Sequence, residues 1–307
     1  MKWNDYAKSR MSRTFFLWIV SGILFGMTLT ASTPVENPDI RTLVITGAAP
    51  YGYHPWERNI ELIEERLNAF GLNQIEYHIA RGLEDWRKWP GDYRDYDAIV
   101  IIYYWSQAPN AELEKLDRYV RDGGALVLVH SALAGFWEQD IFDQWAGIVY
   151  RERDAEYGHN LAFDSSGNRI IRPPGEGGGA VHAPIGPFQI ETHDPDHPIM
   201  KDLPEVWMQS RDELYYNMRG PDTNLHVLAV AEAPDGTFAP QAWVREHGQG
   251  RIFVLTPGHH EPGASSVGFN TLLARGIEWA ATGEVTLPVP VNFPGVTEPS
   301  TELPVFE

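Results

Sequence analysis

Imidazole and carboxylate groups in this sequence stand where predicted strands end, the position at which α/β sheets bind their ligands. The segment GGALVLVHSA, residues 123–132, has five apolar residues in a row and then His130. Such a run, bounded by a glycine pair, is typical of a strand buried on both faces. His130 is therefore predicted at the carboxyl end of that strand, where it could bind a metal or transfer a proton. A structural histidine bonded to a neighbouring backbone group is the alternative.

Other polar groups are predicted at strand ends or in loops that could meet at the same edge. They are His54, the pair Asp212 and Glu213, and the segment GHHE with His259 and His260. Imidazole and carboxylate together suit zinc or another divalent metal, and equally suit acid–base catalysis. Since adjacent side chains of an extended segment point opposite ways, Glu213 and Tyr215 should share a face that Asp212 does not. For the same reason only one of His259 and His260 should face a given pocket.

We expect His130, Glu213 and His259 to meet in one pocket at the carboxyl edge of the sheet. Two imidazoles and a carboxylate are a known zinc-binding set that leaves a fourth position for water or substrate. The predicted cofactor is thus a divalent metal, with zinc favoured; without it the same cluster could act as an acid–base set. No nucleotide cofactor is expected, because the glycines of GEGGGA neither follow a strand nor precede a helix.

Several other candidates have weaker support. Ser131 follows a strand, but VHSAL lacks the flanking glycines of a nucleophile elbow. His182, next to a predicted strand, could close over the site. His193 and His197 flank the turn THDPDHPI, where a structural role as turn caps is favoured over a functional one.

The predicted elements form a single α/β domain. The order strand, helix, strand, strand, helix, strand indicates a doubly wound, mostly parallel central sheet. The predicted strands are 41–46, 75–79, 97–105, 125–129, 187–192, 225–231, 241–246 and 251–256, and the predicted helices are 57–70, 109–121 and 269–280. The polar, glycine-rich segment 151–180 is predicted to be a long, mobile loop that acts as a lid.

The two ends of the chain differ from this domain in composition. Residues 1–31 combine a basic start with one apolar run, which predicts a signal peptide and an exported, periplasmic or extracellular protein. An uncleaved anchor is the alternative, and it would be the protein's only membrane contact. A linker, 32–40, leads to the domain at 41–283. The proline-rich tail, 284–307, is expected to be extended or disordered, or to pack along the surface.

Composition narrows the classes of ligand. The net charge of −18 and the lack of a basic cluster argue against nucleic acid as a partner. The absence of cysteine excludes a thiolate nucleophile and disulfides. Aromatic residues make up 12% of the chain, with 11 Trp, and this slightly favours stacking against sugars.

A set of ordered motifs resembles the ThuA-like (trehalose-utilisation) family over residues 41–283. The motifs are LVITG, RDGGALVLVHSA, DHPIMKDLP, RDELYY, WVREHGQGRIFVLTPGH and RGIEWAA. The resemblance implies a flavodoxin-like domain of the class I glutamine amidotransferase-like superfamily. His130 stands where true amidotransferases carry their nucleophilic cysteine, so amidotransferase chemistry is excluded.

The family is linked to sugar utilisation, and some members hold a metal. The resemblance supports His130, Glu213, Tyr215 and His259 as pocket residues, with His54 in a histidine-bearing first loop. His182 matches a family histidine if 151–180 is an insertion. We therefore expect an enzyme that hydrolyses, eliminates from or isomerises a sugar or keto-sugar, with a small carbohydrate as its ligand.

In this hypothesis His130, Glu213 and Tyr215 are catalytic, and the metal ligands are His130, Glu213 and His259. The expected substrate-binding residues are His54, Trp56, Trp105 and His182. The alternative is a non-catalytic periplasmic sugar-binding or accessory protein.

Overall fold

The computed structural model describes residues 39–47, 54–103 and 107–307, which belong to one compact unit, Glu36–Glu307. The predicted signal peptide 1–31, most of the linker 32–40 and Trp105 lie outside these residues, and the roles given to them stay predictions. In the part of the chain that is described, no helix is long and apolar enough to cross a membrane.

Five parallel strands form one half of the main sheet. Their spatial order is β2-β1-β3-β4-β14, and every neighbouring pair is parallel. The strands are β1 (Arg41–Gly47), β2 (Gln74–Ile79), β3 (Ala98–Tyr103), β4 (Ala125–Val129) and β14 (Gly250–Leu255). Each coincides with a predicted strand to within two residues at either end. The buried strands β1, β3, β4 and β14 appear in the sequence as largely apolar runs, whereas β2 alternates between polar and apolar residues.

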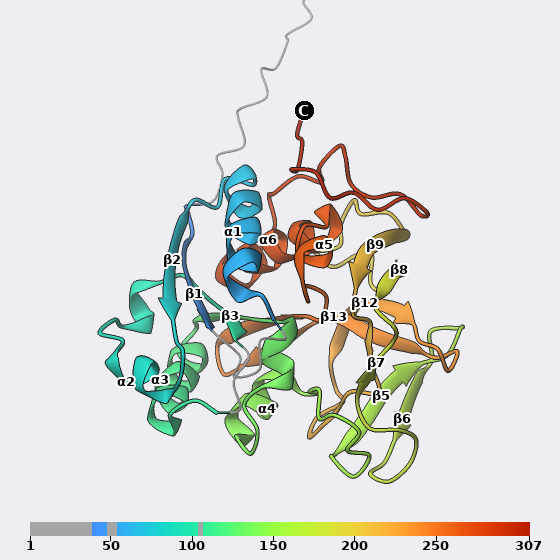
Figure 1. Cartoon of the computed structure of the whole chain (residues 1–307), viewed down its shortest axis with the longest axis horizontal. Helices are drawn as coiled ribbons and strands as arrows, with labels where there is room; N and C mark the ends of the chain where they lie inside the picture. Colours follow the sequence, from blue (N-terminus) through green and yellow to red (C-terminus); the bar gives the residue numbers. More distant parts are fainter. Residues whose placement is uncertain (1–38, 48–53, 104–106) are drawn as a thin grey trace, which may run out of the picture. The chain divides into compact units, whose positions relative to one another are not determined.

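Helices cover both faces of this parallel half (Figure 1). The helices are α1 (Trp56–Ala69), α2 (Leu83–Lys88), α3 (Asn110–Arg121), α4 (Asp140–Ala146), α5 (Glu261–Ala264) and α6 (Val267–Thr282), with short 3₁₀ turns η1 (Tyr93–Asp95) and η2 (His130–Ala134). Alternate residues of β4 point to opposite faces: Leu126 and Leu128 pack with α3 and α4, and Val127 and Val129 pack with α1 and α6. The sheet is therefore buried on both sides.

The other half of the sheet is antiparallel, so the prediction of a mostly parallel sheet is wrong there. Beyond β14 the order continues β13-β12-β8-β9, and each pair is antiparallel. These strands are β13 (Phe238–His247), β12 (His226–Glu232), β8 (Gly186–Thr192) and β9 (Val206–Asp212). The HGQG turn, with Gly248 at φ +64°, reverses the chain between β13 and β14. Strand β9 is not predicted, because its polar residues interrupt the apolar pattern.

Segment 151–180 contains a β-hairpin and is not the irregular loop predicted from its composition. The hairpin consists of β5 (His159–Phe163) and β6 (Arg169–Arg172). It joins the main sheet because β5 pairs with β13 and with β11 (Arg219–Gly220). The glycine-rich part that follows is fixed by Arg219, which is fully buried and donates hydrogen bonds to the carbonyls of Gly158, Pro173 and Gly178.

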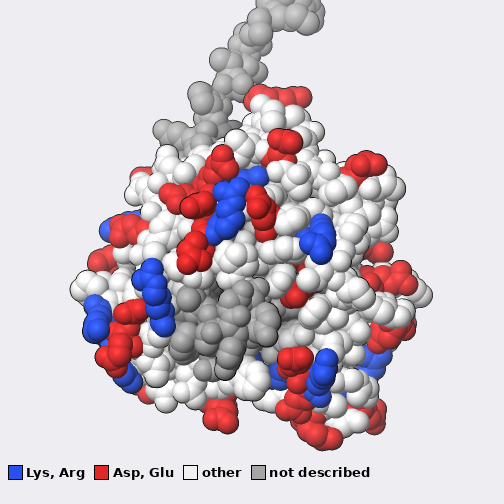
Figure 2. All heavy atoms as spheres, viewed as in Figure 1, with Lys and Arg blue, Asp and Glu red and all other residues white. Residues whose placement is uncertain are grey.

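The C-terminal segment 284–307 is extended and packs against the domain. The Val291 amide donates to the Val305 carbonyl (2.8 Å), and the Met208 amide of β9 donates to the Gly295 carbonyl (2.8 Å). Phe306 packs edge-on against Phe70, with 5.1 Å between ring centroids. Figure 2 shows acidic and basic side chains intermixed on one face of the molecule, without a continuous basic patch among the described residues of that face.

Candidate functional site

His130 lies at the carboxyl end of β4, as predicted, in a strained backbone conformation. Its φ is +41°, which is unusual for a bulky residue, and the side chain is almost fully buried. Nδ1 lies 2.6 Å from the Thr256 carbonyl oxygen, which can only accept, so Nδ1 carries a proton. Burial lowers the pKa of His130 well below its usual range. The neutral ring therefore presents the lone pair of Nε2 to the site.

His259 follows β14 and is placed by a buried carboxylate. Asp212, at the end of β9, is fully buried and accepts hydrogen bonds from the amides of Gly258 (2.8 Å) and His259 (3.0 Å). The His259 ring then lies with Nδ1 3.3 Å from His130 Nε2. Burial, followed by repulsion from His54, lowers the pKa of His259 to about 3, so this ring is also neutral.

Asp212 also holds the residue that follows it. Its carboxylate accepts from the Glu213 amide (2.8 Å) and from the Gln209 side-chain amide (2.9 Å). Burial raises the pKa of Asp212 to about 6, against the opposing effect of its hydrogen-bond donors. The sequence predicts that Asp212 and Glu213 face different ways but gives no sign that Asp212 contacts the loop carrying His259.

Glu213 lies between the two histidines and a third. Its carboxylate oxygens lie 3.4 Å from His259 Nδ1, 3.7 Å from His130 Nε2 and 3.6 Å from His182 Nε2. The side chain is only 10% exposed, and burial raises the pKa of the carboxyl group, against the effects of His182 and a hydrogen bond with Tyr215. Glu213 is thus a carboxyl group that can hold a proton close to two imidazoles.

Tyr215 completes this side of the cluster. Its hydroxyl lies 3.2 Å from His130 Nε2, and the two rings stack with centroids 4.8 Å apart. Strand β10 (Tyr215–Tyr216) pairs with β7 (Val181–His182), and Tyr215 lies opposite His182 in the register. This small sheet brings both residues to the cluster from outside the main sheet.

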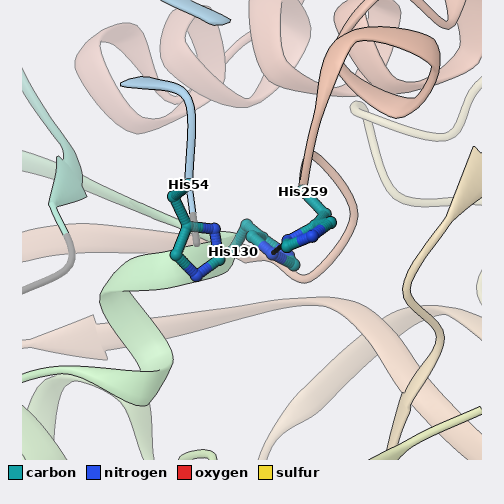
Figure 3. A group of neighbouring side chains, drawn as sticks. All are labelled: His54, His130 and His259. Carbon is teal, nitrogen blue, oxygen red and sulfur yellow. Dashed lines mark hydrogen bonds between the residues drawn. The ribbon is translucent and has the colours of Figure 1, made fainter. Parts of the chain in front are cut away.

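His54 joins the cluster from the loop before α1 (Figure 3). Its ring centroid is 4.8 Å from that of His259 and 5.4 Å from that of His130. One ring nitrogen from each of the three histidines lies within 4.8 Å of the others. Burial lowers the pKa of His54 to about 3, although a hydrogen bond to the His259 backbone opposes that shift.

The donor set fits a divalent transition metal. Three neutral imidazoles converge, which is the ligand set of several catalytic zinc sites. The bond from His130 Nδ1 to a backbone carbonyl is the support that metal-bound histidines commonly have. Glu213 is close enough to two of the rings to be a further ligand or a base. Relative to the predicted metal set, the structure adds His54, for which the sequence suggests substrate contact.

The remaining predicted site residues lie at the edge of the histidine cluster. His182 is 39% exposed and contacts Glu213. Trp56 begins α1, and the Arg81 guanidinium lies over its ring, 5.6 Å from the ring centroid. The Trp56 backbone amide donates to the His54 carbonyl (2.8 Å), which ties the start of the helix to the cluster. His260 hydrogen-bonds to Arg211 (3.1 Å), which leaves His259 as the histidine of the pair that joins the cluster.

Comparisons of the sequence and of the structure with known proteins point to the same family. The sequence profile of the ThuA family, described as trehalose utilisation, matches residues 41–280. A ThuA-like protein from Parabacteroides merdae ATCC 43184 is 28% identical, with a TM-score of 0.78, over 86% of this chain and 98% of that one. Another from Bacteroides uniformis ATCC 8492 is 17% identical, with a TM-score of 0.51, over 83% and 96%, and shows the fold alone. No curated protein matches the sequence.

Proposed function

The chain belongs to the ThuA family, described as trehalose utilisation, and on that premise we propose that it is a metal-assisted enzyme acting on a sugar or keto-sugar. The observation that carries the proposal is the convergence of His54, His130 and His259, all neutral, beside Glu213 and Tyr215. Keeping so many ionisable groups together and out of water costs stability, and such clusters concentrate at functional sites.

His54, His130 and His259 would hold the metal. When bound there, a divalent ion polarises a carbonyl oxygen or lowers the pKa of a water molecule. The lowered pKa values of these histidines keep their lone pairs available at neutral pH. The rings also reach the site from three separate elements, so folding itself assembles the ligand set.

Glu213 would move the proton. Because burial raises its pKa, the carboxyl group takes up a proton more readily than an exposed glutamate does, as a general base that later returns the proton must. The Tyr215 hydroxyl can donate to that carboxylate and so fix its orientation. His182, half-exposed on the other side of Glu213, can offer a hydrogen bond to a sugar hydroxyl. Hydrolysis, elimination and isomerisation all need this combination of a polarised oxygen and a nearby base.

The finer fold assignment is also a proposal. The order β2-β1-β3-β4-β14 matches the flavodoxin-like order 2-1-3-4-5. This supports a flavodoxin-like core, with the antiparallel strands added at one edge. His130 would then take the place of the amidotransferase nucleophile, and the chain has no cysteine to replace it.

The test uses NMR to measure the turnover of two sugars. Trehalose and a keto-disaccharide are incubated with zinc-loaded protein, with Glu213→Gln, and with the control Glu152→Gln, whose side chain is 58% exposed. We expect turnover by the wild type and the control, and a loss of about 100-fold or more in Glu213→Gln, the usual effect of removing a general base. Binding of sugar without turnover by the wild type would favour the non-catalytic alternative. Equal turnover by Glu213→Gln would remove that residue from the mechanism.

A further inference from the structure

A hollow of about 400 Å³ lies away from the histidine cluster. It is lined by His197, Asp222, Asn224, His226, Val244, Arg245, Glu246 and Trp279. Glu246 of β13 pairs with Arg251 at the start of β14, whereas His259 follows the end of that strand. The length of β14, roughly 20 Å, therefore separates the hollow from the cluster. Its volume lies in the range of small-molecule sites.

The charged groups of the hollow are one paired cation and an excess of carboxylates. Arg245 and Asp222 form an ion pair at 2.6 Å, and His226 hydrogen-bonds to Asp194 at 2.6 Å. Glu246 is the remaining charged group of the lining, so the hollow has no excess positive charge to attract an anion. The pairs also hold Arg245 and His226 in fixed positions, which leaves an ordered polar wall for a neutral ligand.

An aromatic surface lies beside this wall. Trp279, in the last turn of α6, packs against His197 with ring centroids 5.0 Å apart, and His197 in turn contacts His226 at 5.2 Å. Nδ1 of His197 accepts the Ile199 amide, so the neutral ring carries its proton on Nε2. His197 is mostly buried and therefore fixes the tilt of the indole.

Polar groups next to the indole are not used by the fold. Among the described residues, the Trp279 indole N–H and the side chains of Asn224 and Glu246 have no hydrogen-bond partner, and none of them is buried. Together they offer donors and acceptors next to an apolar ring. A sugar has hydroxyl groups around an apolar C–H face. It can stack on an aromatic ring through that face while its hydroxyl groups hydrogen-bond to the polar groups beside the ring.

We propose that this hollow, which we call the Trp279 groove, is a second binding site, for a neutral sugar. It does not depend on the reaction proposed for the histidine cluster, from which it is separated by the length of a strand. The turn THDPDHPI, for which the sequence favours a purely structural role, would thus also shape a ligand site through His197.

The test is calorimetric titration with trehalose as the neutral probe, and with glucuronate and choline as anionic and cationic probes. We compare wild type with Trp279→Ala, Trp279→Phe and Asn224→Ala. The control is Trp137→Ala, which removes an indole that is 50% exposed elsewhere. We expect trehalose to bind, at least tenfold more weakly in Trp279→Ala and several-fold more weakly in Asn224→Ala, with an intermediate loss in Trp279→Phe. Asn224 is on the surface, so its variant gives an answer even if Trp279→Ala fails to fold.

His259→Ala separates the two sites. We expect it to retain trehalose binding at the Trp279 groove even where it abolishes turnover. Loss of all trehalose binding in His259→Ala, unchanged binding in both Trp279→Ala and Asn224→Ala, or tighter binding of choline or glucuronate than of trehalose would overturn the proposal. If Trp279→Ala still turns over substrate, the function proposed for the histidine cluster stands, even when one of these results rules out the second site.

Discussion

The tautomer of His130 determines which of its ring nitrogens is available to bind a metal. Because the Thr256 carbonyl binds Nδ1–H, the lone pair of Nε2 points towards His259 and Tyr215. With the opposite tautomer, the ring would place two hydrogen-bond acceptors against each other at Thr256. The metal-binding geometry of this residue is thus fixed by a backbone carbonyl of the strand next to its own.

Asp212 should control metal affinity without contacting the metal. In Asp212→Asn one carboxylate oxygen becomes an NH₂ group that faces backbone amides, so at least one buried N–H loses its acceptor. We expect a loss of about 1–3 kcal/mol in the free energy of unfolding. We also expect metal affinity to fall about 10–100-fold, as for other supporting contacts.

The measurement is a metal titration under conditions where the variant is folded by circular dichroism. Asp235→Asn, which removes the same charge from an exposed turn, is the control and should bind metal as the wild type does. Wild-type affinity in Asp212→Asn would show that the loop holds His259 without this carboxylate.

The side chains of the candidate site could be predicted from the sequence more fully than the residues that hold them in position. His130 and His259 are predicted because each follows an apolar strand, and Glu213 because alternation places it beside Tyr215. The role of Asp212 could not be predicted, since two of its partners are backbone amides almost 50 residues away, and the sequence of the GHHE segment does not show what its amides bind. His54 could be placed at a strand end, but its contact with His259 depends on the path of a loop.

At the scale of elements, Arg219 should hold the glycine-rich part of segment 151–180. Arg219→Met removes the hydrogen bonds to four backbone carbonyls, including that of Glu176, while keeping most of the apolar side-chain volume. We expect a loss of about 2–4 kcal/mol in the free energy of unfolding and much faster proteolysis between residues 173 and 180.

Limited proteolysis followed by mass spectrometry checks this expectation. Arg153→Met, which alters a side chain that is 82% exposed, is the matched control and should be cut at the wild-type rate. Equal cleavage rates in the two variants would mean that the β5–β6 hairpin alone fixes the segment.

A strand could be predicted from the sequence where its buried residues form an apolar run. The central parallel strands are apolar on both faces, whereas β9 buries the polar residues Gln209 and Ser210 along with Trp207 and escapes a search for apolar runs. The hairpin of segment 151–180 is hidden for a related reason: β6 is only four residues long, and none of its residues is buried.

At the scale of the whole molecule, stability should fall as the pH drops below about 6.5. Burial lowers the pKa of His54 and His259 to about 3 and of His197 to about 4, and lowers that of His130 as well. The native state therefore binds fewer protons than the unfolded state between pH 6.5 and about 4. The stability from these four groups is fully present above pH 6.5 and is lost as the pH falls.

Four carboxyl groups act in the opposite direction, because burial also raises the pKa of Glu191 and Glu213. Burial raises the pKa of Asp143 and Asp212 to about 6, so their contribution is present below pH 3.8 and is lost as the pH rises through about 6. Burial also lowers the pKa of His78, His193 and His260, so seven histidines outweigh four carboxyl groups and the net slope favours neutral pH. Urea unfolding between pH 7.5 and 4.5 measures it. In His197→Phe the slope should decrease by about 1.4 kcal/mol per pH unit, the value for one proton. A flat profile would mean that the histidines are protonated in the folded protein.

The most direct measurement of the central claim is a cobalt titration followed by visible absorption. Wild-type protein should bind one Co²⁺ per chain with the spectrum of nitrogen ligands. His54→Ala, His130→Ala and His259→Ala should each weaken binding by at least about 100-fold, because each would remove a direct ligand and not merely a support. His226→Ala, which removes a histidine that is 54% exposed elsewhere, should bind like the wild type. Wild-type cobalt affinity in any one of the three cluster variants would contradict the claim that these rings form a single metal centre.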